Sequence, residues 1–159
     1  MKKITNNIVF SLIFSLLISF PIMAEPTISF NESRVMIGKG DVHTLDVLME
    51  DFPLSEGGGI SLTYNPSIIQ IDDININSEL WSFVNMPGSI DNENGKVTGF
   101  IFSSYKGVSG NSRIATVTIS GLKNGTTRLV LQGSRLNPFS SDGKIINVNF
   151  NRSLIRVKR

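Results

Sequence analysis

Few residues in this chain could perform catalysis. His43 is the only histidine, and no acid is placed at a spacing that would pair with it. The segment Gly107–Asn111, GVSGN, resembles a nucleophile elbow, but it lacks the final glycine and precedes a predicted strand rather than a helix. Because a catalytic serine needs a base, we predict no catalytic residues and a protein that is not an enzyme.

The acidic residues also fail to form a convincing metal site. Asp72 and Asp73 are adjacent, so their side chains point to opposite sides of a strand end, which favours a solvated turn over a calcium site. The segment Asp91–Asn94 could offer oxygen ligands to calcium, and a polar hairpin tip explains it equally well. The chain contains no cysteine. We therefore predict no metal and no cofactor.

Glycines and aromatic residues suggest two further kinds of site. The run Gly57–Gly59 is a poor phosphate cradle because no Lys-Ser/Thr pair or helix follows it. Asn65-Pro66 breaks the chain after the next strand, and we interpret it as a corner. Sugar binding by stacking needs exposed aromatic rings, for which Trp81 and Tyr105 are the candidates, although Trp81 is also typical of a core residue.

The elements that must position these residues are predicted to be strands. Short apolar segments alternate with period two and are bounded by Gly, Asn, Pro or Asp, which is typical of a β-sandwich or barrel. Only 78–83 could form a helical turn. Nine strands suit two packed antiparallel sheets. They are predicted at 35–37, 45–49, 60–64, 68–71, 97–102, 114–119, 128–132, 145–149 and 154–157.

Alternation also assigns the faces of these strands. Ile60, Leu62 and Tyr64 should point inward. In the strand at 97–102, alternation allows either Phe100 and Phe102 or Val97 and Ile101 in the core, and we predict the phenylalanines because their rings bury more area. The opposite face is then small, polar and flat, with Ile101 as an exposed apolar residue, which favours a protein partner. The predicted partner face comprises Ser61, Thr63, Gly99, Ile101, Ser103, Arg128, Val130 and Gln132.

The N-terminal segment and the charge balance limit where the protein acts. Lys2 and Lys3 precede an apolar run that is shorter than the roughly 20 residues of a membrane span, so residues 1–24 are predicted to be a secretory signal peptide. Residues 25–159 then form one exported domain, extracellular, periplasmic or at the cell surface, with no membrane insertion. Removing the two lysines leaves 13 of the 15 basic residues against 13 acidic ones. This balance gives no support to nucleic-acid binding.

Several motifs, in this order, resemble a cohesin domain. They are SLTYNPSIIQI at 61–71, ENGKVTGFIFSS at 93–104, GVSGNSRIATVTI at 107–119 and the strand at 126–133. The resemblance spans nearly all of 28–157 and is strongest to members in secreted proteins of Gram-negative bacteria. The chain departs from it at Asn65, where an aspartate is usual, and at Gly57 and Gly59, where cellulosomal members carry polar side chains that contact dockerin.

The resemblance implies a nine-stranded jelly-roll β-sandwich, shared with some carbohydrate-binding modules, and a non-catalytic role. It also implies binding of a dockerin-like or surface protein through the partner face, in polysaccharide breakdown or surface assembly. Two alternatives stay open: a carbohydrate-binding module that uses Trp81 and Tyr105 on a polysaccharide, and a structural surface domain without a ligand.

Overall fold

Two unusually long strands organise the structure, a computed structural model that describes residues 24–159. The predicted signal peptide lies outside the described residues, except for Ala24. No helix in the described part is long and apolar enough to cross a membrane. The strands are β1 (Thr27–Phe30), β2 (Arg34–Gly38), β3 (Val42–Thr63), β4 (Ile69–Ile76), β5 (Val84–Met86), β6 (Ser89–Asp91), β7 (Lys96–Gly121), β8 (Gly125–Gly133), β9 (Ser140–Ser141), β10 (Lys144–Ile145), β11 (Asn149–Phe150) and β12 (Arg152–Lys158).

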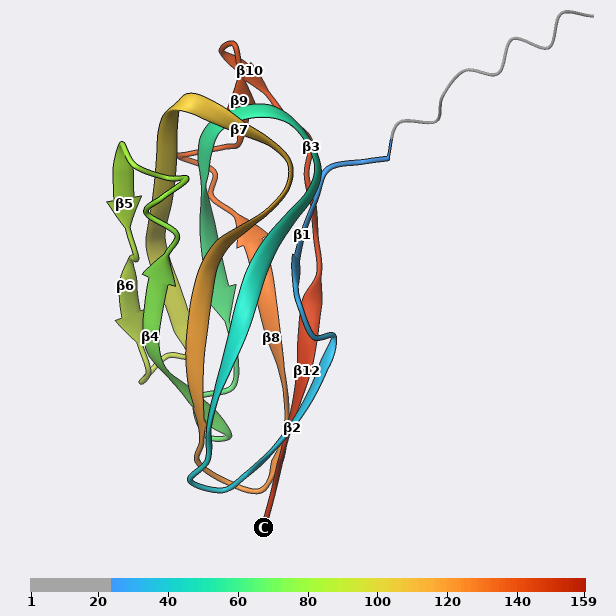
Figure 1. Ribbon diagram of the computed structural model, residues 1–159. Coiled ribbons are helices and arrows are strands. Elements are labelled where there is room, and N and C mark those ends of the chain that lie inside the picture. The colour runs from blue at the N-terminus through green and yellow to red at the C-terminus, as the bar shows by residue number, and fades with distance from the viewer. Residues whose placement is uncertain (1–23) are drawn as a thin grey trace, which may run out of the picture.

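The strands β3 and β7, of 22 and 26 residues, each belong to both layers of the sandwich. Residues 42–49 of β3 pair with 112–120 of β7, and residues 57–63 of β3 pair with 96–103 of β7. Between these two ladders both strands run over one end of the molecule, at the top of Figure 1. Positive φ angles at Asp51, Gly107 and Gly110 bend the chain there without ending the strands.

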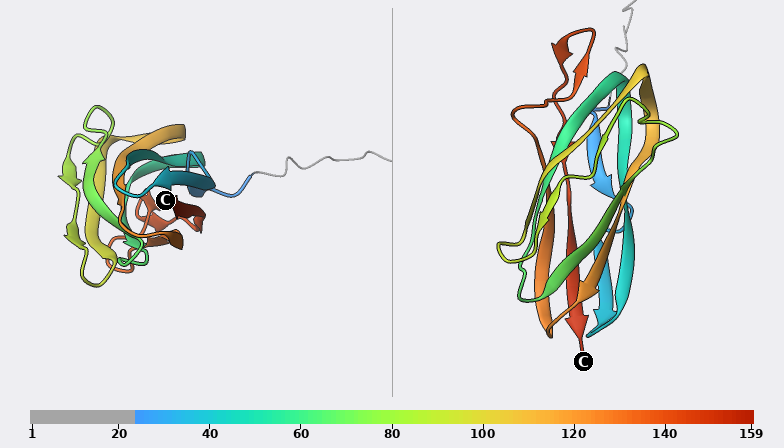
Figure 2. Two further views of the ribbon diagram at one scale, coloured as in Figure 1. Left: turned by 90° about the horizontal axis from the view of Figure 1, so that it is seen from below. Right: turned by 90° about the vertical axis from the view of Figure 1, so that its left-hand side faces the viewer.

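Each layer grows outward from this shared pair of strands. Sheet I contains β5 and β6, the first half of β7, the second half of β3, and then β8, β12 and β2. Sheet II contains β4, the second half of β7, the first half of β3, and then β1 and β11. Figure 2 shows the two layers from the end and from the side, with the C-terminus opposite to the β9–β10 hairpin.

The core between the two sheets follows the predicted alternation. Ile60, Leu62 and Tyr64 are buried, as are Phe100 and Phe102. Apolar side chains from both sheets complete it: Ile28, Leu45, Val47, Ile71, Ala115, Val117, Ile119, Leu129, Leu131, Ile155 and Val157. The predicted all-β sandwich is therefore confirmed.

A bulge resolves the competition between Val97 and Phe100 for the core. Both side chains are fully buried because Gly99, at φ +72°, adds one residue to β7 between them. The three residues of β3 from Ile60 to Leu62 accordingly lie opposite the four residues of β7 from Val97 to Phe100. Strict alternation cannot accommodate two inward residues three positions apart, which is why the sequence pattern was ambiguous here.

Other predicted boundaries were wrong. The described chain forms twelve strands rather than nine, and β1, β5, β6 and β9 were not expected. The strand predicted at 145–149 is instead the end of β10 and the start of β11, with 146–148 outside both. The pairings β1–β11 and β12–β2 are parallel, so the prediction of purely antiparallel sheets does not hold. These pairs join segments distant in the chain, and parallel pairing becomes feasible when a long connection separates the strands.

The Asn-Pro break is a corner, as the sequence indicated. The side-chain oxygen of Asn65 accepts a hydrogen bond from the backbone N–H of Ser67 at 2.9 Å, and its own N–H donates to Thr127 Oγ1 at 2.9 Å. The Tyr64 hydroxyl donates to Asn92 Oδ1 at 2.5 Å, which ties the corner to the β6–β7 hairpin tip. These contacts assign Asn65 a role in the architecture.

The run Gly57–Gly59 allows close packing of β7 and of the segment after β8 against β3. A Cβ on Gly57 would lie 2.2 Å from the carbonyl oxygen of Phe102, and one on Gly58 would lie 2.7 Å from the ring of Phe139. Alternation with inward Ile60 predicts an outward position for Gly59, yet Gly59 is buried because Ser134 packs over it. The missing side chains thus allow β7 and the segment after β8 to approach β3 closely.

We expect the packing of the Phe139 ring against Gly58 to contribute strongly to the free energy of unfolding. The ring is buried and makes edge contacts with Phe52 and Phe102 at centroid distances of 5.3 and 5.7 Å. Phe139→Ala should lower the free energy of unfolding by about 3–5 kcal/mol, measured by urea denaturation. Leu136→Ala, on an exposed residue of the same segment, should change it by less than about 0.5 kcal/mol. Equal effects of the two variants would contradict the packing role.

Candidate functional site

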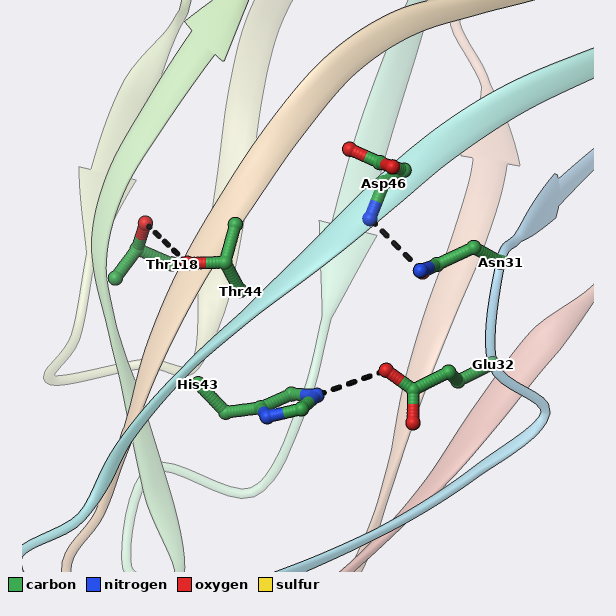
Figure 3. Close-up of polar contacts among 6 residues, drawn as sticks. All are labelled: Asn31, Glu32, His43, Thr44, Asp46 and Thr118. Carbon is green, nitrogen blue, oxygen red and sulfur yellow. Dashed lines mark hydrogen bonds and ion pairs between the residues drawn. The ribbon is translucent and has the colours of Figure 1, made fainter.

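His43 forms a structural contact at the border of the core, on the side of β3 that also carries the buried Leu45 and Val47. Its Nε2 lies 2.9 Å from Oε1 of Glu32, which follows β1 (Figure 3). Close by, Asn31 Oδ1 accepts a hydrogen bond from the N–H of Asp46 at 2.9 Å. His43 therefore has an acidic partner, Glu32, which the sequence spacing did not indicate. Within the described residues, no serine or threonine hydroxyl is hydrogen-bonded to His43. The pair holds the β1–β2 connection against β3.

The segment that resembled a nucleophile elbow lies where β7 crosses between the sheets. Gly107 and Gly110 adopt φ angles of +67° and +72°, and Ser109 between them is exposed. Asn111 Oδ1 accepts a hydrogen bond from the N–H of Asp51 at 2.9 Å, which joins the two crossing strands. The two glycines form a bend in β7. Among the described residues, no side-chain hydrogen bond joins Ser109 to a histidine or a carboxylate.

The candidate acidic sites are held by local hydrogen bonds. Asp72 occupies a bulge in β4 rather than the predicted turn, and its carboxylate accepts hydrogen bonds from Gln70 and Ser120 at 2.6 and 2.5 Å. At the β6–β7 tip, Asn94 donates to both carboxylate oxygens of Asp91, which lowers the pKa of Asp91 below its usual range. No cluster of potential metal ligands is found in residues 24–159.

The side chain of Tyr64 is buried just after the end of β3. Desolvation raises the pKa of Tyr64, since the charged phenolate is less well solvated inside the sandwich than in water. Its hydroxyl is engaged by Asn92, so Tyr64 serves the corner and is no candidate for acid–base chemistry.

The predicted partner face is assembled from three neighbouring strands of sheet I. The register places Ser61 opposite Gln132 and Thr63 opposite Val130. The residues Ser61, Thr63, Gly99, Ile101, Ser103, Arg128, Val130 and Gln132 all point away from the core, and are exposed or half-buried. Sequence alternation thus brought together residues that the fold also brings together.

Ile101 is less exposed than alternation alone suggested. It is half-buried because β7 has neighbours on both sides here, with Gly59 of β3 on one side and Met86 of β5 on the other. Strand β5 was not predicted, so its contribution to the face was missed. The alternation of Val84 and Met86 around a polar Asn was the available signal, and it was weakened by the Pro-Gly-Ser segment that follows at 87–89.

Five residues form what we call the apolar strip on the outer face of sheet I: Phe83, Val84, Met86, Ile101 and Tyr105. Val84 pairs with Ser103 and Met86 with Ile101. The side chains of Phe83 and Met86 are 55% and 52% exposed, and Tyr105 is 80% exposed. The rings of Phe83 and Tyr105 lie 4.0 Å apart at 42°. Exposed large apolar side chains on adjacent strands mark a surface suited to a partner.

A depression of about 240 Å³, which we call the glycine hollow, lies beside this strip. Gly57 and Gly58 contribute backbone to its wall. Its lining combines apolar Val84, Ile101 and Pro138 with polar Glu56, Ser103, Asn137 and Ser140. The mixture of a few polar groups with apolar walls is typical of a recognition surface.

The structure separates the two aromatic residues proposed for sugar contact. Trp81 is completely buried against Phe102, at a centroid distance of 4.8 Å, so its ring has no face open to a polysaccharide. The prediction of a carbohydrate contact at Trp81 was therefore wrong, because the turn after β4 folds the indole into the core. Tyr105 is exposed, as such a contact would require.

The fold closely matches solved cohesin domains. No protein-family model and no curated protein sequence matches the chain. A non-cellulosomal cohesin from Archaeoglobus fulgidus superposes with a TM-score of 0.70 at 18% identity, covering 86% of this chain and 93% of the archaeal one. A cohesin from Acetivibrio cellulolyticus, solved with a dockerin, gives 0.65 at 18% identity and covers 84% and 99%.

A third match is the cohesin of a type I cohesin–dockerin complex from Clostridium thermocellum, with a TM-score of 0.65 at 14% identity over 84% of this chain and 95% of that one. The chain therefore has the cohesin jelly-roll fold. The fold implied by the sequence resemblance is confirmed.

The burial of Trp81 can be tested by fluorescence, since it is the only tryptophan. Acrylamide should quench the folded protein several-fold less efficiently than the urea-unfolded protein, because the quencher cannot reach the indole. Addition of polysaccharides should leave the emission spectrum unchanged. Equal quenching of the folded and unfolded protein would show that the indole is accessible.

Proposed function

We propose that this protein is a non-catalytic recognition module that binds another protein through the outer face of sheet I. The observation that carries the proposal is the apolar strip, which lies beside the glycine hollow on that face. Aromatic residues and methionine are enriched in the central parts of protein interfaces, where they supply most of the binding energy. The polar residues of the predicted partner face would then form the rim.

The structural neighbours support a protein as the partner. Several of the matched cohesins were solved in complex with dockerins. By analogy of fold, we propose a partner of dockerin type or another surface protein for this chain. The predicted signal peptide and the sequence resemblance further support an exported protein that acts in surface assembly or polysaccharide breakdown.

Carbohydrate binding is the second candidate. It is favoured by the exposed ring of Tyr105, which borders a hollow of about 320 Å³ lined also by Glu79, Ser82 and Lys106. A tyrosine face with polar groups around it can stack on and hydrogen-bond to a sugar. Protein recognition is favoured over this alternative because the apolar strip continues from Tyr105 along β7 to Ile101 and onto the neighbouring β5. A structural domain without a ligand would use neither surface.

An affinity experiment tests the protein-binding face. The protein serves as bait for the secreted and envelope fraction of its own producing organism, beside an Ile101→Asp variant. A charge in the middle of the apolar strip should cost more than about 2 kcal/mol of binding free energy and abolish capture of the dominant protein.

The matched control is Met36→Asp, which places the same charge on another exposed apolar residue at the far edge of sheet I. It should capture the same protein as the unchanged chain. Undiminished capture by Ile101→Asp would show that this face is not the binding surface, and retention of glycan alone would support the carbohydrate alternative.

A further inference from the structure

Two neighbouring depressions on the outer face of sheet I share part of their lining, and we call the two together the groove. The first is the glycine hollow, and the second is a depression of about 270 Å³ bordered by Phe83 and Tyr105. Glu56 and Ser103 line both depressions, so they stand where the two meet. The groove therefore has an aromatic end, an acidic middle and an aliphatic end.

Glu56 is the acidic residue of this groove, and it is available for a partner. It precedes the glycine run in β3, is exposed, and takes part in none of the ion pairs found among residues 24–159. Lys106 and Glu79 line a separate depression that also borders Tyr105, and neither of them lines the groove. The groove itself is thus negatively charged.

A carboxylate beside an exposed aromatic pair is suited to a cationic side chain. A guanidinium can stack on a tyrosine ring while it donates hydrogen bonds to a carboxylate, and an ammonium group can make the same two interactions as a point charge. Phe83 packs against Tyr105 at 4.0 Å and supports its ring in place. This support lowers the entropic cost of holding the ring for a ligand.

The other end of the groove is suited to an aliphatic side chain. Val84, Ile101 and Pro138 border the glycine hollow, and a Cβ on Gly57 would press on the backbone of Phe102 and on Ser103. Ser103 Oγ has no hydrogen-bond partner in the described part of the chain. A polar backbone group of a bound segment would satisfy it after rotation about χ1.

We propose that this groove binds a partner segment in which an arginine or lysine lies next to an aliphatic side chain. The basic group is held between Glu56 and Tyr105, and the aliphatic group fills the glycine hollow. This inference rests on the proposed function, because it specifies the chemistry of the partner that sheet I recognises. The two ends of the groove together select the pair of side chains rather than either one alone.

Selection from a phage-displayed library of random peptides tests the proposal on the folded protein. The enriched peptides should share a basic residue beside an aliphatic one. Glu56→Gln and Tyr105→Ala should each weaken a synthetic peptide of that consensus by about tenfold, measured by calorimetry. Tyr105→Phe keeps the ring face and should retain most of the affinity, and Glu79→Gln removes a charge outside the groove and should have no effect.

The variants separate failure of this inference from failure of the proposed function. Peptides that lose binding with Ile101→Asp but not with Glu56→Gln or Tyr105→Ala would overturn the groove and leave recognition by sheet I in place. A stronger effect of Glu79→Gln than of Glu56→Gln would also overturn it. Peptides insensitive to all of these substitutions, or no enriched consensus at all, would overturn both.

Discussion

The structure depends on two strands that each have to serve two sheets. Because β3 and β7 pair with each other in both layers, their bends must occur at the same end of the sandwich and must match. The hydrogen bond between Asp51 and Asn111 and the register shifts from Met49 to Gly57 lie in this shared bend. Within the bend, Phe52 still pairs with Gly110 and Ser55 with Val108, which limits the number of costly unpaired backbone groups near the core.

This crossing explains why glycines accumulate beside the candidate site. Where β3 enters sheet I, it must pass close to the backbone of β7 on one side and to Phe139 below. Side chains at Gly57 and Gly58 would collide with these neighbours, so the packing that stabilises the crossing also removes the side chains that could project from the strand. Gly57 and Gly58 accordingly contribute only backbone to the wall of the glycine hollow, which is otherwise shaped by the side chains that border it.

The parts of the fold that follow strict alternation could be predicted, and those that break it could not. Ile60 and Leu62 lie in β3, which has no extra residue here and pairs with β8 without a shift in register, so a period of two placed them and Tyr64 in the core. The burial of both Val97 and Phe100 could not be predicted without the bulge between them, and that bulge depends on the register of β3 against β7. Strand β5 has three residues and owes its conformation to pairing with β7, so local sequence carried little signal for it. Phe83, Val84 and Met86 of the apolar strip were missed for that reason, whereas Tyr105 was considered only as a sugar contact.

The two outer faces of the sandwich differ in a way that bears on function. On sheet II the outward side chains engage one another: Thr44 lies 3.5 Å from Thr118, and Arg113 pairs with Asp46 at 3.7 Å. Such contacts satisfy polar groups within the chain and leave a hydrated surface with little to gain from a partner. On sheet I the outward positions of β5 and β7 instead carry apolar groups that water solvates poorly. Association gains most where such groups are removed from water, so the asymmetry between the faces favours sheet I as the side that binds.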